Sequence, residues 1–285
     1  AMASLASASS FKVFQANSQD EDLFTATSTS SASAGSYNID VTQVASRDKL
    51  ASSAFTDYNS VVGEGTLSIS VGSESFDVAI DSSNSSLAGI RTAINNASDN
   101  TGVTASIITD DSGARLVLTS NETGTENAIS VSVSGDSDGN NTDTSGLSAF
   151  VYSSGGTQNL SSISTAKDAI VNIDGFTTTS SSNSIANAID GVTLNVKDVG
   201  SSTLDITRND EAILESVNEF ASAYNALMTE IKSQRSGQLE ADSTLLTIER
   251  QVRDVFNSGA SITGSSFSYL VEAGISFDKN GVMTV

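Results

Sequence analysis

The spacing of apolar residues changes near Arg208, and this change constrains the fold more than any other feature of the chain. Before Arg208, apolar and polar residues alternate, as at Leu67, Ile69 and Val71, which is the period of a strand with one buried face. After Arg208, apolar residues recur every three or four positions, which is the period of an amphipathic helix. A turn-rich region of antiparallel strands followed by a helical end predicts the α+β fold class.

The helix expected after Arg208 carries a heptad-like seam. Its members follow one another at spacings of 4, 3, 4, 3 and 4 residues: Ile213, Val217, Phe220, Tyr224, Leu227 and Ile231. Asn209 is expected to be the N-cap of this helix, and Asp242 is expected to cap a second helix. The seam has two interpretations. It can pack on the second helix of the same chain, or it can bundle with a further helix, which would favour oligomers.

The stretch SSNS occurs twice, at 82–85 and at 181–184, and GVT follows each copy. Alternating apolar residues before the first copy predict a β-hairpin, and the apolar residues after it, at helical spacing, predict a short helix. The second copy is followed by a shorter stretch that also has helical spacing. The same order of elements predicts one structural unit used twice, in two different domains.

Serine is a preferred N-cap residue, so each SSNS copy is expected to cap the helix after it. The expected caps are Ser85, or its neighbour Ser86, in the first copy and Ser184 in the second. A capping serine needs no reactive neighbour, so neither copy predicts a catalytic serine.

The segment between the two copies, at about 135–162, is rich in Gly, Ser, Asn and Asp and is expected to be a surface loop or a crossing between domains. Its stretch DSDGNNTDTSGL, which starts at Asp136, has some features of a calcium-binding loop. Asn141 stands where an EF-hand has glycine, and Leu147 stands where it has glutamate. A polar loop is the favoured interpretation, and no metal site is predicted.

The chain is strongly acidic, with 34 Asp and Glu against 13 Lys and Arg and a formal net charge of −21. Such a surface repels nucleic acid, and no basic stripe offsets it. The same charge argues against anionic membranes as partners, and the longest apolar run is far shorter than a membrane span.

The composition also argues against most enzyme classes. The absence of histidine and cysteine excludes histidine-based triads, thiolate catalysis and zinc sites built on those residues. A hydrolase with a pair of carboxylates is left open by composition, but most acidic residues lie in expected turns or on helix faces. We therefore predict a protein that is not an enzyme and has no cofactor.

Three parts of the chain resemble the hook-associated protein 2 family of flagellar filament cap proteins. The stretch ATSTSSASAGSYNIDVTQVASRDKLAS, at 26–52, resembles the amino-terminal region of that family, and 168–233 and GISFDKNGVMTV, at 274–285, resemble its carboxy-terminal region. The first SSNS unit is similar to a repeat of flagellins and cap proteins. The terminal helical segments of the family have no counterpart here, so a chain truncated at both ends is expected.

The resemblance implies a nested arrangement of three domains, with β-rich head domains and a stalk-proximal domain of helices and strands. The stalk-proximal domain would combine 1–35 with 208–285, a split head domain 36–64 with 163–207, and an inserted head domain would span 65–162. The implied function is structural: subunits form a ring at the tip of the growing filament, retain exported flagellin and help it to fold into place.

The partners implied by the resemblance are other copies of the chain, flagellin and the proteins of the hook–filament junction. The implied location is extracellular, at the flagellum tip, after export without a cleaved signal peptide. A secreted adhesin or carbohydrate-binding β-domain protein is the alternative, because aromatic side chains such as Tyr58, Phe150 and Tyr152 in loops could stack on sugars.

Overall fold

The computed structural model describes residues 12–100, 102–237, 243–257 and 274–285. The chain forms two compact units. The head unit comprises 16–27 and 35–205, and the helical unit comprises 1–15, 28–34 and 206–285. Residues 16–27, which the three-domain prediction assigns to the stalk-proximal domain, therefore belong to the head unit, where Phe24 is fully buried.

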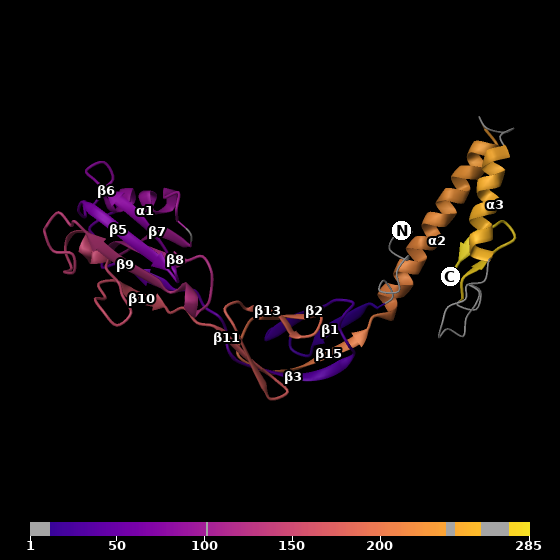
Figure 1. The fold of residues 1–285 in the computed structure, drawn as a ribbon, viewed down its shortest axis with the longest axis horizontal. Helices are drawn as coiled ribbons and strands as arrows, with labels where there is room; N and C mark the ends of the chain where they lie inside the picture. The colour runs from indigo at the N-terminus through magenta and orange to yellow at the C-terminus, as the bar shows by residue number, and fades with distance from the viewer. Residues whose placement is uncertain (1–11, 101, 238–242, 258–273) are drawn as a thin grey trace. The chain divides into compact units, whose positions relative to one another are not determined.

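One part of the head unit is built on two antiparallel sheets (Figure 1). The order in the five-stranded sheet is β1 (Phe14–Ser18), β15 (Gly200–Arg208), β3 (Gly35–Gln43), β11 (Ala169–Ile173) and β12 (Phe176–Ser180). The three-stranded sheet has the order β13 (Ser184–Ile189), β14 (Val192–Val196) and β2 (Phe24–Ser28). In β11, three alternate residues are buried, as the period of two requires for a strand with one covered face.

The segment after the second SSNS stretch is a strand and not the expected helix. β13 and β14 form a hairpin, with Ile185 opposite Leu194 and Ile189 opposite Val192. A spacing of four residues places Ile185 and Ile189 on one side of a helix. In β13, however, the register shifts between Ala186 and Ile189, and this irregularity brings both isoleucines to one face of the strand, opposite Leu194 and Val192. Both side chains are buried in the strand, and a helix of six residues would lack the length that helix formation requires. The two SSNS copies are therefore not the same structural unit.

The other part of the head unit contains two further sheets and α1 (Leu87–Asn96). The four-stranded sheet has the order β10 (Ser161–Ser164), β4 (Lys49–Ala51), β8 (Gly113–Ser120) and β7 (Val103–Asp110). The three-stranded sheet has the order β6 (Glu74–Ile80), β5 (Gly65–Val71) and β9 (Ile129–Ser134). The short 3-10 helices are η3 (Thr125–Asn127) and η4 (Gly146–Phe150).

The core of this second part extends beyond the predicted range of 65–162. Leu50 in β4 is fully buried in it, and Phe55 packs against it with its ring 5.9 Å from that of Phe150. The range 36–64 was expected in the split head domain, yet its end contributes to this core because β4 pairs with β8. The expected polar crossing also contributes, since Leu147 and Phe150 of η4 are buried there.

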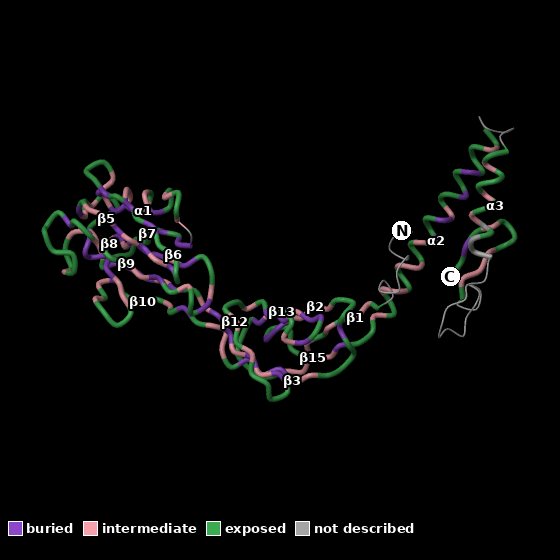
Figure 2. Tube along the Cα trace, viewed as in Figure 1, coloured by how far each residue is buried: buried purple, intermediate pink, exposed green. Residues whose placement is uncertain are grey.

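The helical unit contains α2 (Asp210–Arg235), α3 (Ser243–Asn257) and a short hairpin of β16 (Ser276–Phe277) and β17 (Met283–Thr284). Its core unites residues of α2 with the hairpin: Ala221, Tyr224, Met228, Ile231 and Met283. Every buried position of α2, purple in Figure 2, is Ala221 or a later residue. In the part of the chain that the structure describes, no helix has the length and apolar character needed to cross a membrane.

Candidate functional site

The first SSNS stretch ends beside the helix that it was expected to cap, but the cap is the next residue. Ser86 Oγ accepts a hydrogen bond from Gly89 N at 3.1 Å, and the extended backbone of Ser86 marks it as the N-cap of α1. Ser85 is buried, and its carbonyl oxygen accepts from Val62 N. The prediction of Ser85 as the cap is corrected to Ser86, the alternative that the sequence also offered.

The second SSNS stretch has a different role. Ser184 begins β13, so it caps no helix. Its neighbour Asn183 instead holds another segment of the chain, because both ends of its side-chain amide bond to the backbone of Ala45. The prediction of Ser184 as a helix cap is therefore wrong, because no helix follows it.

Asn209 is the N-cap of α2, where its Oδ1 accepts from Ala212 N at 2.9 Å. Asp210 and Glu211 lie in the first turn, and Lys232 and Arg235 lie in the last, which is the arrangement that the helix dipole favours. Asp242, the other expected cap, lies outside the described residues.

The seam of α2 is buried at some of its expected positions and not at others. Tyr224 and Ile231 are buried, and Phe220 packs against the same core. Leu227 is 40% exposed, while its neighbour Met228 is buried, so the buried stripe of α2 is 221, 224, 228 and 231. The buried residues also repeat every seven positions, from 221 to 228 and from 224 to 231, but part of the stripe is shifted by one residue from the expected positions 220 and 227.

The part of α2 before Phe220 has no such core among the described residues. Ile213 and Val217 are half-buried, and Leu214 is 53% exposed. Figure 2 shows this part of α2 in green and pink. An apolar stripe with incomplete cover is a candidate surface for assembly.

The two parts of the head unit are joined by a set of hydrogen bonds around η3. Both carboxylate oxygens of Asp168 accept from Thr125, one from its backbone N at 2.7 Å and one from its hydroxyl at 2.8 Å. Thr123 Oγ1 donates to the carbonyl of Ser181 at 2.6 Å. These bonds connect segments that are distant in sequence, which fits a head unit that is one compact body.

Asp48 is a buried acid at the same junction. Its Oδ2 accepts from Ile129 N at 2.8 Å, and its own backbone N donates to Ser120 Oγ. Burial raises the pKa of Asp48, and hydrogen bonds from the backbone of Ile129, Lys49 and Ala166 oppose that rise. Asp48 therefore serves as an acceptor that ties three segments together.

The loop with features of a calcium site is organised around Asp136, which is buried. Its Oδ2 accepts from both the backbone N and the hydroxyl of Ser148, each at 2.8 Å, so the carboxylate binds the first turn of η4. The pKa of Asp138 is lowered, first by a hydrogen bond from Asn140 N and then by one from the Ser145 hydroxyl. Among the described residues, no group of three Asp or Glu side chains is placed to hold a metal ion.

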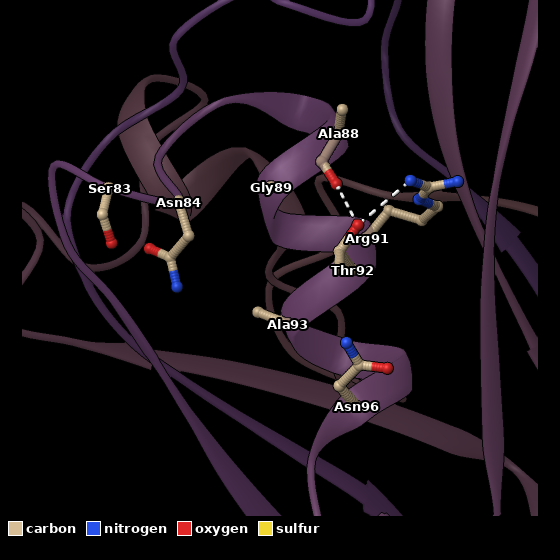
Figure 3. Close-up of a pocket in the computed structure, with 8 residues that line it drawn as sticks. All are labelled: Ser83, Asn84, Ala88, Gly89, Arg91, Thr92, Ala93 and Asn96. Atoms are coloured by element: carbon tan, nitrogen blue, oxygen red, sulfur yellow. Dashed lines mark hydrogen bonds between the residues drawn. The ribbon is translucent and has the colours of Figure 1, made fainter.

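An open hollow of about 420 Å³ lies between α1 and the turn before it. Figure 3 shows Ser83 and Asn84 on the turn, across from Ala93 and Asn96 on the helix. Gly89 faces Asn84, whose carbonyl oxygen would lie 2.3 Å from an added Cβ, so only glycine permits this approach of helix and turn. Arg91 also lines the hollow, and its Nη2 donates to Thr92 Oγ1.

Family models match three consecutive regions of the chain. The model described as "Flagellar hook-associated protein 2 N-terminus" matches 1–48, and "Flagellar hook-associated protein 2 C-terminus" matches 166–285. The model described as "Flagellin hook IN motif" matches 66–122, which contains β6, α1, β7, β8 and all of β5 except its first residue.

Several characterised proteins are similar to this chain. The B-type flagellar hook-associated protein 2 of Pseudomonas aeruginosa PAO1 is 35% identical over all of this chain and 64% of its own length. Flagellar hook-associated protein 2 of Escherichia coli K12 is 33% identical over 90% of this chain and 58% of its own length. The chain thus spans less than two thirds of either relative.

Solved structures are similar to most of the chain. The D1-D2-D3 domains of the flagellar cap protein FliD from Escherichia coli match with a TM-score of 0.85 and 31% identity, over 99% of this chain and 80% of that one. FliD (HAP2) from Pseudomonas aeruginosa PAO1 matches with a TM-score of 0.60 and 37% identity, over 74% of this chain and 96% of that one. The N-terminal model, the hook IN motif and the C-terminal model also match in that order along the sequence, and the chain belongs to the flagellar hook-associated protein 2 family.

Proposed function

We propose that this chain is the greater part of a structural subunit of the flagellar filament cap, which oligomerises at the filament tip and retains exported flagellin while it folds and polymerises. The observation that carries the proposal is the similarity to the FliD D1-D2-D3 structure along 99% of the chain. The family is one of structural cap proteins and not of enzymes. No observation favours an adhesin or a carbohydrate-binding protein.

The structure supports the proposal through its two units. The head unit has a buried core and a strongly hydrogen-bonded junction, so it can project from a filament end as a stable body. The helical unit has apolar side chains without full cover in α2, which supports self-association through helices. Other copies of the chain, flagellin and hook–filament junction proteins are the proposed partners, and the flagellum tip outside the cell is the proposed location.

The proposed assembly also requires that the exported chain unfold and refold easily. The chain has no cysteine and no proline, so neither disulfide formation nor X–Pro isomerisation can slow refolding. Stopped-flow refolding should show no phase of tens of seconds, and such a phase would contradict this part of the proposal.

Deletion of the gene in its own bacterium tests the function directly. The deletion strain is expected to secrete monomeric flagellin into the medium and to carry few or short filaments in electron micrographs, and the intact gene should restore them. Normal filaments in the deletion strain, or glycan-dependent attachment as the only lost property, would overturn the proposal.

A further inference from the structure

The hairpin of β11 and β12 carries an aromatic side chain that is almost completely exposed. Phe176 is 79% exposed, more than any other large apolar side chain among the described residues. Isolated exposed apolar residues are common on protein surfaces, so exposure alone indicates nothing. Phe176 differs because it follows a turn that the surrounding residues hold in place.

Three hydrogen bonds fix this turn. Asn38 N donates to Asp174 Oδ1 at 2.9 Å, Asp174 N donates to Asn38 O at 3.0 Å, and Gly175 N donates to Asn172 Oδ1 at 2.8 Å. Asp174 and Gly175 both have positive φ, as a two-residue hairpin turn requires. A rigid aromatic side chain loses little conformational entropy on binding, which is why interfaces use such residues as anchors.

The hollow beside α1 has the properties of a receptor for such an anchor. Its volume of about 420 Å³ lies in the range of sites that bind small groups. Ala88, Gly89 and Ala93 give its wall small apolar surfaces, and the polar side chains of Asn84 and Asn96 lie beside them.

The charges of the two surfaces are complementary. Arg91 is the sole charged residue between Asp81 and Asp99, and Asp174 is the sole charged residue between Asp168 and Asp190. Arg91 Nε is buried without a hydrogen-bond partner, and neither Arg91 nor Asp174 forms a salt bridge with any described residue. Copies of a chain with a net charge of −21 repel each other, so a contact between them is favoured where a cation on one meets an anion on the other.

We propose that the tip of the β11–β12 hairpin of one copy docks in the α1 hollow of a second copy, with Phe176 in the hollow and Asp174 facing Arg91. The proposal rests on the proposed cap function, which brings copies together. The two surfaces differ, so the contact is head-to-tail and can continue from copy to copy, as a ring requires.

This contact is small. One phenylalanine buries about 150–250 Å², whereas a stable interface between two proteins buries about 1,200–2,000 Å² in total. The docked hairpin therefore adds direction and register to an assembly that other surfaces hold together, and it forms only a weak complex between free copies.

Disulfide trapping detects such a weak contact, and the chain contains no cysteine that would interfere. Phe176→Cys and Asn96→Cys variants of the full chain are mixed at high concentration under mild oxidation, and the disulfide-linked dimer is quantified. Val199→Cys replaces Phe176→Cys in the matched control, because Val199 is also apolar and 56% exposed in the head unit. Two cysteines join only when their Cα atoms come within about 7 Å, so the yield reports this specific contact.

The Phe176→Cys and Asn96→Cys mixture is expected to give a several-fold higher yield than the control, and Arg91→Glu in the Asn96→Cys chain should lower that yield several-fold. A yield no higher than that of the control would overturn the proposal. Preferential linkage of Phe176→Cys to itself would also overturn it, because that product marks a symmetric contact. The proposed cap function is tested by a separate experiment. It would be overturned if the deletion strain retained its flagellin, and that result does not depend on Phe176.

Discussion

Asn183 bonds to the backbone of Ala45 as a second strand would. Ala45 N donates to Asn183 Oδ1 at 2.7 Å, and Asn183 Nδ2 donates to Ala45 O at 2.9 Å. The two residues are 138 positions apart in sequence, so one side chain fixes the segment before β4 to the turn before β13. Asn183 occupies the third position of the second SSNS stretch, and this cross-link is the structural role of that stretch.

Replacement of Asn183 by alanine is expected to destabilise the head unit by about 1–3 kcal/mol, because it leaves a part-buried donor and acceptor of Ala45 without partners. Urea unfolding followed by far-UV circular dichroism measures the change. Ser181→Ala is the matched control, because only the backbone carbonyl of Ser181 takes part in its bond to Thr123. Equal stability of the two variants would contradict the role assigned to Asn183.

The two SSNS stretches show what sequence patterns can and cannot predict. The first was predicted well, because Leu87, Ile90 and Ile94 need a helix to share one buried face. The second is a strand although Ile185 and Ile189 have helical spacing, because they pair with Leu194 and Val192 of β14 across an irregularity in the register. Pairing partners far along the chain are not contained in local periodicity.

The candidate surfaces were predicted to different extents. In the seam of α2, the buried Met228 lies one residue from the expected Leu227, because a helical period places residues 227 and 228 on adjacent parts of the surface. Two other expected members, Ile213 and Val217, are only half-buried. The docking hairpin and the hollow were not predicted, since exposure of Phe176 depends on β12 lying at the edge of its sheet. The junction around Asp168 was missed for a similar reason: its partner Thr125 is 43 residues away and no local pattern connects them.

The cap of α1 can be tested with three serine variants. Ser86→Ala is expected to lower the stability of the head unit by about 1 kcal/mol, because Gly89 N loses its acceptor. Ser184→Ala should change the stability by less than about 0.5 kcal/mol, since Ser184 is an exposed residue at the start of a strand. Chemical denaturation of all three, with Ser85→Ala as the neighbour of the cap, gives the comparison, and a larger loss for Ser85→Ala would contradict the assignment of Ser86.

The buried stripe of α2 can be tested at neighbouring positions. Met228→Ala removes a side chain that is 3% exposed and should destabilise the helical unit by about 2–5 kcal/mol through the cavity it leaves. Leu227→Ala removes a side chain that is 40% exposed and should have a much smaller effect. Hydrogen exchange of α2 amides in both variants reports the helical unit separately from the head unit. Equal loss of protection would contradict the placement of the buried position at 228 and not at 227.

The terminal hairpin should lose stability in acid. The backbone N of Val282 donates to Asp278, and this bond is the main reason why the pKa of Asp278 is lowered. Such a carboxylate has a lower pKa in the folded chain than in the unfolded chain. It stabilises the fold fully at pH values above its unfolded-state pKa, and this contribution is lost as the pH falls through its folded-state pKa. The stability advantage of the wild type over Asp278→Asn should therefore be full at pH 7 and shrink below about pH 4. An advantage that grows on acidification would contradict the assigned sign.

The close approach of α1 to the turn before it can be tested by replacing Gly89 with alanine, with the same replacement at Gly102 as the control. A Cβ at Gly89 would lie 2.3 Å from the carbonyl oxygen of Asn84, whereas a Cβ at Gly102 would meet nothing nearer than Val71 Cγ1 at 3.7 Å. Alanine is the better helix former by about 1 kcal/mol, so propensity alone would make Gly89→Ala stabilising. The clash with rigid backbone outweighs that gain, and Gly89→Ala is expected to destabilise the head unit by about 1–3 kcal/mol.

Gly102→Ala should be tolerated. Thermal unfolding of both variants measures the difference, and a stabilised Gly89→Ala chain would show that the turn can move away from α1.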